Sequence, residues 1–118
     1  DVFGVAYVAV QAPDHLAGGD LRALALDIRG RLAADRPAIV AVTSGSDKGV
    51  SFIVATNEKA RDWNLKAGEI VKVLGAPMGG RGGGKDDIAQ GGGTDAAGAS
   101  AGLERTEHWI GQRVTGSA

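Results

Sequence analysis

AIVAVTSGSDKGVSFIVAT, residues 38–56 of this 118-residue chain, predicts two strands and the hairpin that joins them. Residues 38–43 and 50–56 are rich in valine, isoleucine and threonine, the residue types that favour strands. The polar segment between them, SGSDKG, has the length and composition of a hairpin loop. A pair of neighbouring strands joined by a hairpin loop is therefore expected.

Upstream of this hairpin, the sequence predicts a strand and then a helix. Residues 2–10 (VFGVAYVAV) are apolar at odd and even positions alike, which is typical of a strand covered on both faces. Apolar residues then recur at helical spacing: Leu21, Leu24, Ala25, Ile28 and Leu32. We expect this stripe to be core, with Asp20 as the N-cap of the helix and Pro37 ending it.

Downstream of the hairpin, we expect a short helix, a long loop and a final helix. The short helix covers residues 66–74, and residues 79–93 (GGRGGGKDDIAQGGG) form a glycine-rich loop. Thr94 or Asp95 is placed to cap the final helix. The inward-facing residues of the two helices are Ile70, Val71, Leu74, Ala99, Leu103, Thr106 and Ile110.

The predicted order is β–α–β–β–α–glycine loop–α. It defines an α/β fold in which helices pack on a small mixed β-sheet. The length allows one domain, residues 1–118. Because the chain starts at Asp1 and not at a methionine, we expect it to be a piece of a longer protein.

Composition excludes several classes of protein. Thirteen basic and fourteen acidic residues give a net charge of −1, which excludes a histone-like polycation. The absence of cysteine excludes disulfide scaffolds and thiolate metal sites, and His15 and His108 are far apart in the sequence. No apolar run reaches the roughly 20 residues of a membrane span. We therefore expect a cytoplasmic protein with no membrane partner and no metal in this chain.

Eight of the twenty glycines lie within residues 79–93, and this cluster is the main candidate site. Glycine allows backbone N–H groups to approach and surround an anion, and Arg81 and Lys85 add positive charge to the same segment. The combination suits a phosphate, and a chain of phosphates better than a single one. The alternative is a solvated surface loop whose charges contact only water.

Two nucleotide-binding motifs fail in this cluster. Residues 79–85 match the first seven positions of a P-loop, but Asp86 replaces the Ser or Thr that would hold magnesium. Residues 91–96 fit a loose dinucleotide fingerprint, but they follow a loop where that motif needs a strand. No nucleophile, base or carboxylate pair stands in a catalytic context, so we expect no catalytic residue in this chain.

Two further sets of residues are candidates for nucleic-acid contacts. Arg22, Arg29 and Arg36 are seven residues apart and would line one exposed helix face, as a phosphate stripe or as a solvated face with ion pairs. Trp63 and Trp109 have the chemistry to stack on bases, but they adjoin apolar helix positions. We expect both tryptophans to belong to the core.

Residues 79–98, GGRGGGKDDIAQGGGTDAAG, resemble the extreme C-terminal signature of bacterial alanyl-tRNA synthetases. In that signature two glycines, a basic residue, three glycines and a second basic residue precede Ala-Gln and more glycines. Residues 50–74, VSFIVATNEKARDWNLKAGEIVKVL, are similar to the strand, polar connector and Lys-Ala-Gly-Glu segment of the same family. The resemblance covers essentially the whole chain and points to the DHH-associated (C-Ala) domain. Asp86 stands where the family commonly has proline, so we expect the rigidity of the loop to differ.

The resemblance implies a tRNA-binding C-terminal domain. In the family this domain docks on the tRNA elbow and couples aminoacylation to editing, so its partners are tRNA(Ala) and the other modules of the synthetase. The parent enzyme, an alanine–tRNA ligase, uses ATP and carries zinc in its editing module, whereas no cofactor is expected in this chain. A helical subdomain outside these residues often mediates homodimerisation.

Composition and resemblance together predict a nucleic-acid site made of Gly79, Gly80, Arg81, Gly82, Gly83, Gly84, Lys85 and Gln90. The glycines would supply backbone donors and clearance, the two cations would neutralise phosphates, and Gln90 would hydrogen-bond a sugar or base edge. The alternative is the substrate-binding domain of a RecJ-like DHH phosphodiesterase, in which a histidine ends the glycine loop. Lys85 at that place favours the synthetase. With a net charge of −1, any positive potential is local and binding is expected to be weak.

Overall fold

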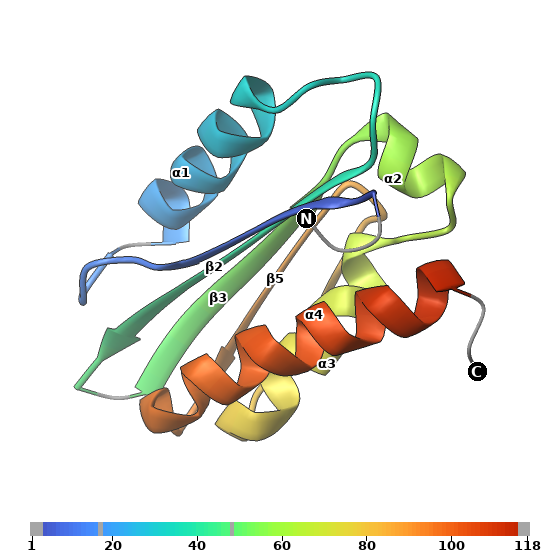
Figure 1. Cartoon of the computed structure of the whole chain (residues 1–118). Helices are drawn as coiled ribbons and strands as arrows, with labels where there is room; N and C mark the ends of the chain where they lie inside the picture. The colour runs from blue at the N-terminus through green and yellow to red at the C-terminus, as the bar shows by residue number, and fades with distance from the viewer. Residues whose placement is uncertain (1–3, 17, 48, 116–118) are drawn as a thin grey trace.

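The computed structural model describes residues 4–16, 18–47 and 49–115, and its centre is a five-stranded mixed sheet (Figure 1). The strands are β1 (Ala6–Gln11), β2 (Ala38–Ser46), β3 (Gly49–Thr56), β4 (Arg81–Gly84) and β5 (Ile88–Gly93). They lie in the order β1–β2–β3–β5–β4, and β1 and β2 form the parallel pair. The predicted α/β class, a small mixed sheet packed by helices, is confirmed.

Helices cover both faces of this sheet (Figure 1). α1 (Gly18–Arg31) connects β1 to β2 and packs over β2 and β3 on one face. α3 (Ala67–Gly75) and α4 (Ala99–Thr115) pack against each other on the opposite face. The shorter elements are α2 (Glu58–Asp62) and the 3-10 turns η1 (Ala76–Met78) and η2 (Ala96–Gly98).

The predicted β2–β3 hairpin is present, but its loop is shorter than SGSDKG. Antiparallel pairing runs from Ile39 opposite Thr56 to Ser46 opposite Gly49. Ser44 remains in the strand although it is buried, because its hydroxyl donates to the Pro13 carbonyl at 2.7 Å. A polar residue thus continues a strand when its hydrogen bonds are satisfied inside the protein.

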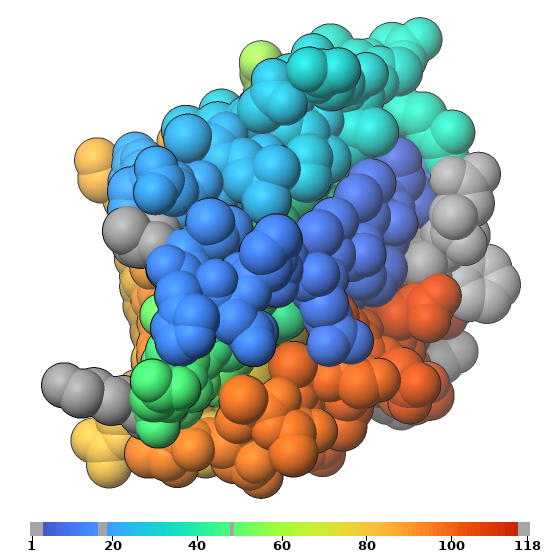
Figure 2. All heavy atoms as spheres, turned by 90° about the vertical axis from the view of Figure 1, so that its left-hand side faces the viewer, coloured from blue at the N-terminus to red at the C-terminus, as the bar shows by residue number. Residues whose placement is uncertain are grey.

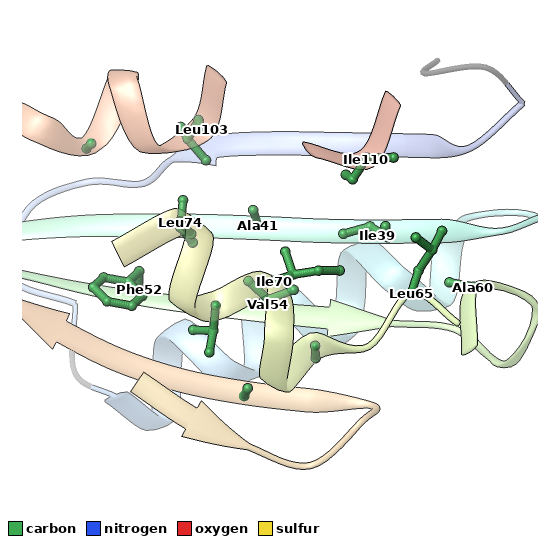
Figure 3. Close-up of a cluster of buried hydrophobic side chains, with 14 of the residues drawn as sticks. Ile39, Ala41, Phe52, Val54, Ala60, Leu65, Ile70, Leu74, Leu103 and Ile110 are labelled. Carbon is green, nitrogen blue, oxygen red and sulfur yellow. The ribbon is translucent and has the colours of Figure 1, made fainter. Parts of the chain in front are cut away.

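Alternate residues of the central strands β2 and β3 belong to two separate hydrophobic cores, one on each face of the sheet. Phe52 and Val54 of β3 face α3 and α4, together with Ile39 of β2 (Figure 3). Ile53 and Ala55 of β3 face α1. Because both faces of β2 and β3 are covered, these strands are apolar at consecutive positions.

The first strand and helix differ from expectation in their details. β1 is an edge strand that is only half-buried, lying between α1 and α4 where neither helix covers it fully (Figure 2). Residues 2 and 3 of the predicted strand lie outside the described residues. α1 begins at Gly18, so Asp20 lies in the first helical turn and is not the N-cap. There its carboxylate faces the positive end of the helix dipole.

The predicted apolar stripe of α1 faces the sheet, but its residues are buried to different extents. Leu21 and Ala25 are fully buried against β2 and β3. Leu24, Ile28 and Leu32 are only half-buried and pack at the margin of the same core. They flank the line of closest contact with the sheet, so the residues expected to be core lie at its edge and not at its centre.

The later helices are as predicted. Ile70, Val71 and Leu74 of α3 are buried, as are the four predicted residues of α4: Ala99, Leu103, Thr106 and Ile110. The Asp95 side chain caps η2, which leads into α4, by accepting a hydrogen bond from the Ala97 N–H at 3.1 Å. α2 escaped prediction because five residues are too few to show a helical period.

Tyr7 ties the edge strand β1 to α4. Its hydroxyl donates to the Leu103 carbonyl oxygen at 2.9 Å, and burial raises the pKa of this phenol above its usual value. Tyr7→Phe keeps the ring and removes the hydrogen bond, so we expect the free energy of unfolding at neutral pH to fall by about 1 kcal/mol.

The same variant tests the pKa. Because the pKa of Tyr7 is higher in the folded state than in the unfolded state, its contribution to stability is complete below pH about 10 and is lost above it. Urea denaturation between neutral and alkaline pH should show a smaller alkaline loss of stability in Tyr7→Phe than in the parent. Equal losses would mean that the phenol is not the group that titrates.

Candidate nucleic-acid interface

The glycine-rich segment is not a loop: it forms the β4–β5 hairpin at one edge of the sheet. Arg81 lies opposite Gly92 and Gly84 lies opposite Ala89, while β5 also pairs with β3. The Lys85 N–H donates to the Ile88 carbonyl at 3.0 Å and closes the turn. The expectation of a loop over residues 79–93 is therefore wrong, and the backbone of this segment is held by sheet pairing.

Close packing explains most of the glycines. A Cβ at Gly91 would lie 2.5 Å from a ring carbon of Phe52 and 2.7 Å from the Cα of Gly82. A Cβ at Gly80 would lie 2.8 Å from the same ring, and one at Gly93 would lie 2.5 Å from the Met78 carbonyl oxygen. Real Cβ atoms essentially never come so close. These glycines let the hairpin lie directly on Phe52 and η1.

Gly83 is different, because a Cβ there would meet nothing within 4 Å. Side chains alternate between the two faces of a strand, so Arg81 and Gly83 share one face of β4 and Gly82 points to the other. A Cβ at Gly82 would lie 3.2 Å from Val71 of α3, so the Gly82 face is packed. The Arg81 and Gly83 face is the open one.

A hollow of about 270 Å³ lies on this open face, between the hairpin and α1. It exists because α1 packs over β2 and β3 and leaves the β4–β5 end of the sheet uncovered. The residues that line the hollow are Arg22, Gly83, Gly84, Lys85, Asp87, Ile88, Ala89 and Gln90. Four residues of the predicted site, Gly83, Gly84, Lys85 and Gln90, are thus brought together.

The remaining predicted site residues lie outside the hollow. The N–H groups of Gly79 and Gly80 already donate to Ala76 and Gly75 carbonyls, at 3.2 and 2.9 Å, so they do not form an anion-binding nest. The Lys85–Ile88 hydrogen bond fixes the alternation of the β4–β5 ladder. By that alternation the N–H groups of Gly82 and Gly84 point to the edge of β4 that no described strand pairs. Arg81 is exposed at the start of β4.

The turn of the hairpin is fastened to the buried end of β3. Thr56, which is fully buried, donates its N–H to the Asp87 carbonyl at 2.9 Å and its hydroxyl to the Asp86 carbonyl at 2.7 Å. The Ala67 N–H also donates to the Asp86 carbonyl, at 2.9 Å. Although Asp86 stands where proline is common in the resembling family, these bonds hold the turn in place.

The arginine stripe does not form. α1 ends at Arg31, so Arg36 lies beyond it and donates to the Gly4 carbonyl at 3.2 Å. Arg29 donates to the Thr56 carbonyl at 3.3 Å. Arg22 alone of the three reaches the hollow, and sequence reasoning had not connected it with the glycine segment. Asp87 was likewise missed as a lining residue.

The two tryptophans differ in their environments. Trp109 packs partly against the core and lies under the Arg113 guanidinium, 4.7 Å from the ring centroid. Trp63 is 47% exposed at the end of α2, so its assignment to the core is wrong. Neither lines the hollow.

Within the described ranges, no three His, Cys, Asp or Glu side chains are placed to hold a metal ion. In the same residues, no helix is long and apolar enough to cross a membrane.

A small α/β module with a cationic glycine hairpin at its sheet edge is the class that the fold and the hollow define. The profile of the DHHA1 domain matches residues 4–112. The chain therefore belongs to the DHHA1 domain family, and the resemblance to the C-terminal domain of alanyl-tRNA synthetases is confirmed.

Relatives with high identity bear the name alanine–tRNA ligase. The protein of Saccharopolyspora erythraea is 50% identical over 114 residues, covering 97% of this chain. That of Kineococcus radiotolerans is 47% identical over 117 residues, covering 99% of this chain. The chain spans 13% of the length of each of these relatives.

Solved structures show the same fold. The C-Ala domain of Aquifex aeolicus alanyl-tRNA synthetase has a TM-score of 0.76 at 22% identity, over 91% of this chain and 90% of that one. A protein described as a member of the s1p family of ribosomal proteins, with a DHH domain, has a TM-score of 0.57 at 15% identity. That match covers 83% of this chain and 22% of the other. At these identities the likeness concerns the fold alone.

Proposed function

We propose that this chain is the tRNA-binding module of an alanine–tRNA ligase and that it holds tRNA through the open face of the β4–β5 hairpin. The observation that carries the proposal is Gly83, whose missing side chain no packing contact explains. Lys85 adjoins it in the hollow, and the relatives at 47–50% identity are named alanine–tRNA ligases. A ligand that must approach the backbone is a reason for glycine at such a position.

The chemistry of the hairpin suits a phosphate backbone. Arg81, the first residue of β4, and Lys85, which follows its last residue, neutralise phosphates. The N–H groups of Gly82 and Gly84 on the free edge donate to phosphate or sugar oxygens, and Gln90 meets a sugar or base edge. With a net charge of −1 the attraction is local, so this chain alone binds weakly.

The role of the module in the whole protein follows from the same proposal. It docks on the elbow of tRNA(Ala) and brings aminoacylation and editing modules to one tRNA, in the cytoplasm and without membrane contact. ATP is used elsewhere in the ligase. Zinc is held in the editing module of the ligase. Homodimerisation would use regions outside these 118 residues.

A salt titration of tRNA binding tests the hairpin. The logarithm of the binding constant falls with the logarithm of salt by about 0.7–0.9 per neutralised phosphate. Arg81→Ala and Lys85→Ala should each weaken binding at low salt and make this slope shallower by that amount. Lys72→Ala, an exposed lysine on α3, is the matched control and should bind like the parent. Charge variants indistinguishable from the control would refute the hairpin as the phosphate site.

A further inference from the structure

The charged residues of the hollow are arranged more specifically than those of a simple cationic patch. Its two cations come from elements distant in sequence, Arg22 from α1 and Lys85 from the tip of the hairpin. A phosphate in the hollow would therefore have a positively charged side chain on each side, Arg22 on the side of α1 and Lys85 on the side of the hairpin. Among the residues that the structure describes, none forms a hydrogen bond or ion pair with Arg22 that would explain its position over the hairpin.

An acid, Asp87, also lines the hollow, and a site for phosphate alone would not favour it. The backbone of Asp87 is fixed by its hydrogen bond from the buried Thr56 N–H at 2.9 Å, so the residue is held at the wall of the hollow. A carboxylate repels phosphate but accepts a hydrogen bond from a hydroxyl. A ligand with a hydroxyl donor close to a phosphate therefore fits both the acid and the cations.

The volume of the hollow further limits which ligands can fit it. A volume of about 270 Å³ lies just below the ~300–1,000 Å³ of ordinary small-molecule pockets. The hollow therefore has room for one sugar–phosphate unit of a longer polymer, but not for a base-paired nucleic-acid helix. In RNA each such unit carries a 2′-hydroxyl, which DNA lacks.

We propose that the hollow seats one ribose–phosphate unit of the bound RNA, with Arg22 and Lys85 on the phosphate and the Asp87 carboxylate accepting a hydrogen bond from the 2′-hydroxyl. Asp87 then makes the module select RNA over DNA, and Arg22 adds a third phosphate contact to those of the hairpin. This inference rests on the proposed function and names the feature of the nucleic acid that the site reads.

Asp86 provides a matched control for Asp87. The two acids are neighbours in one turn, and Asp87 lines the hollow whereas Asp86 does not. Asp86→Ala and Asp87→Ala remove the same charge from nearly the same place. Their general effect on phosphate binding is therefore the same, and any difference in the ratio of RNA to DNA affinity reports the contact with the sugar.

The experiment measures the affinity of each variant for a tRNA(Ala) transcript and for DNA of the same sequence. We expect the parent to bind the RNA about tenfold more tightly than the DNA. Asp87→Ala should bring this ratio close to one, and Asp86→Ala should leave it unchanged. Arg22→Ala should weaken RNA binding and make the salt slope shallower by at most about 0.7–0.9, because Lys85 still contacts the same phosphate. Arg31→Ala, an exposed arginine at the other end of α1, should do neither.

The outcomes separate this inference from the proposed function. If Arg81→Ala and Lys85→Ala weaken RNA binding but Arg22→Ala does not, the hairpin site stands and the proposed contact of Arg22 with the phosphate is wrong. If Asp87→Ala strengthens RNA and DNA binding equally, the acid only repels phosphate and the sugar contact is wrong. If the parent binds neither nucleic acid, the proposed function and this inference both fail.

Discussion

Gly91→Val should lower the free energy of unfolding by about 3 kcal/mol or more, at the upper end of overpacking effects. The first side-chain carbon at this position already falls 2.5 Å from the Phe52 ring and 2.7 Å from the Cα of Gly82. Phe52 is fully buried under α3, and Gly82 belongs to the paired strand, so neither can retreat without opening the core or the hairpin.

The stability control is the same substitution eight residues earlier. A Cβ at Gly83 meets nothing within 4 Å, and valine favours strands, so the free energy of unfolding of Gly83→Val should stay within about 0.5 kcal/mol of the parent. Chemical denaturation of both variants measures the difference. Equal midpoints for the two would mean that β5 does not lie on Phe52 as described.

Gly83→Val should nevertheless weaken tRNA binding by about tenfold, the equivalent of ~1.4 kcal/mol. Its side chain projects into the hollow, where the proposed sugar–phosphate unit approaches the backbone. Because no charge changes, the salt slope should keep its value while the affinity falls at every salt concentration. Affinity equal to that of the parent would show that tRNA does not approach this face.

These variants divide one run of glycines into two kinds. Gly80, Gly91 and Gly93 are required by the fold, because Phe52, Met78 and the neighbouring strand occupy the space of their side chains. Gly83 is not. A glycine cluster in a sequence thus does not by itself indicate a ligand site, and the contacts of each position decide which role it has.

The central hairpin and the later helices could be predicted because their signals are local. The β-branched runs that became β2 and β3, and the apolar spacing of α3 and α4, are patterns that neighbouring residues make by themselves. The glycine segment could be assigned to a family only by its resemblance to alanyl-tRNA synthetases, because no local hydrophobic pattern identifies it.

The hairpin strands could not be predicted for a physical reason. Glycine disfavours strands and leaves no side-chain alternation to detect, so residues 79–93 looked like a loop. Their conformation is imposed from outside the segment, by pairing of β5 with β3 and by the ring of Phe52. The sequence also could not show that Arg22 belongs to the candidate site. Arg22 and the hairpin are distant in the sequence and meet only because α1 packs on the sheet.

NMR of the isotope-labelled chain, titrated with tRNA(Ala), would locate the bound surface residue by residue. The amide signals of Gly83, Gly84, Lys85 and Gln90 should shift most, together with the signal of Arg22 across the hollow. A second groove, of about 310 Å³, is lined by Arg105, Trp109 and neighbouring residues. Signal shifts confined to this groove, or to the edge strand β1, would contradict the hairpin as the tRNA site.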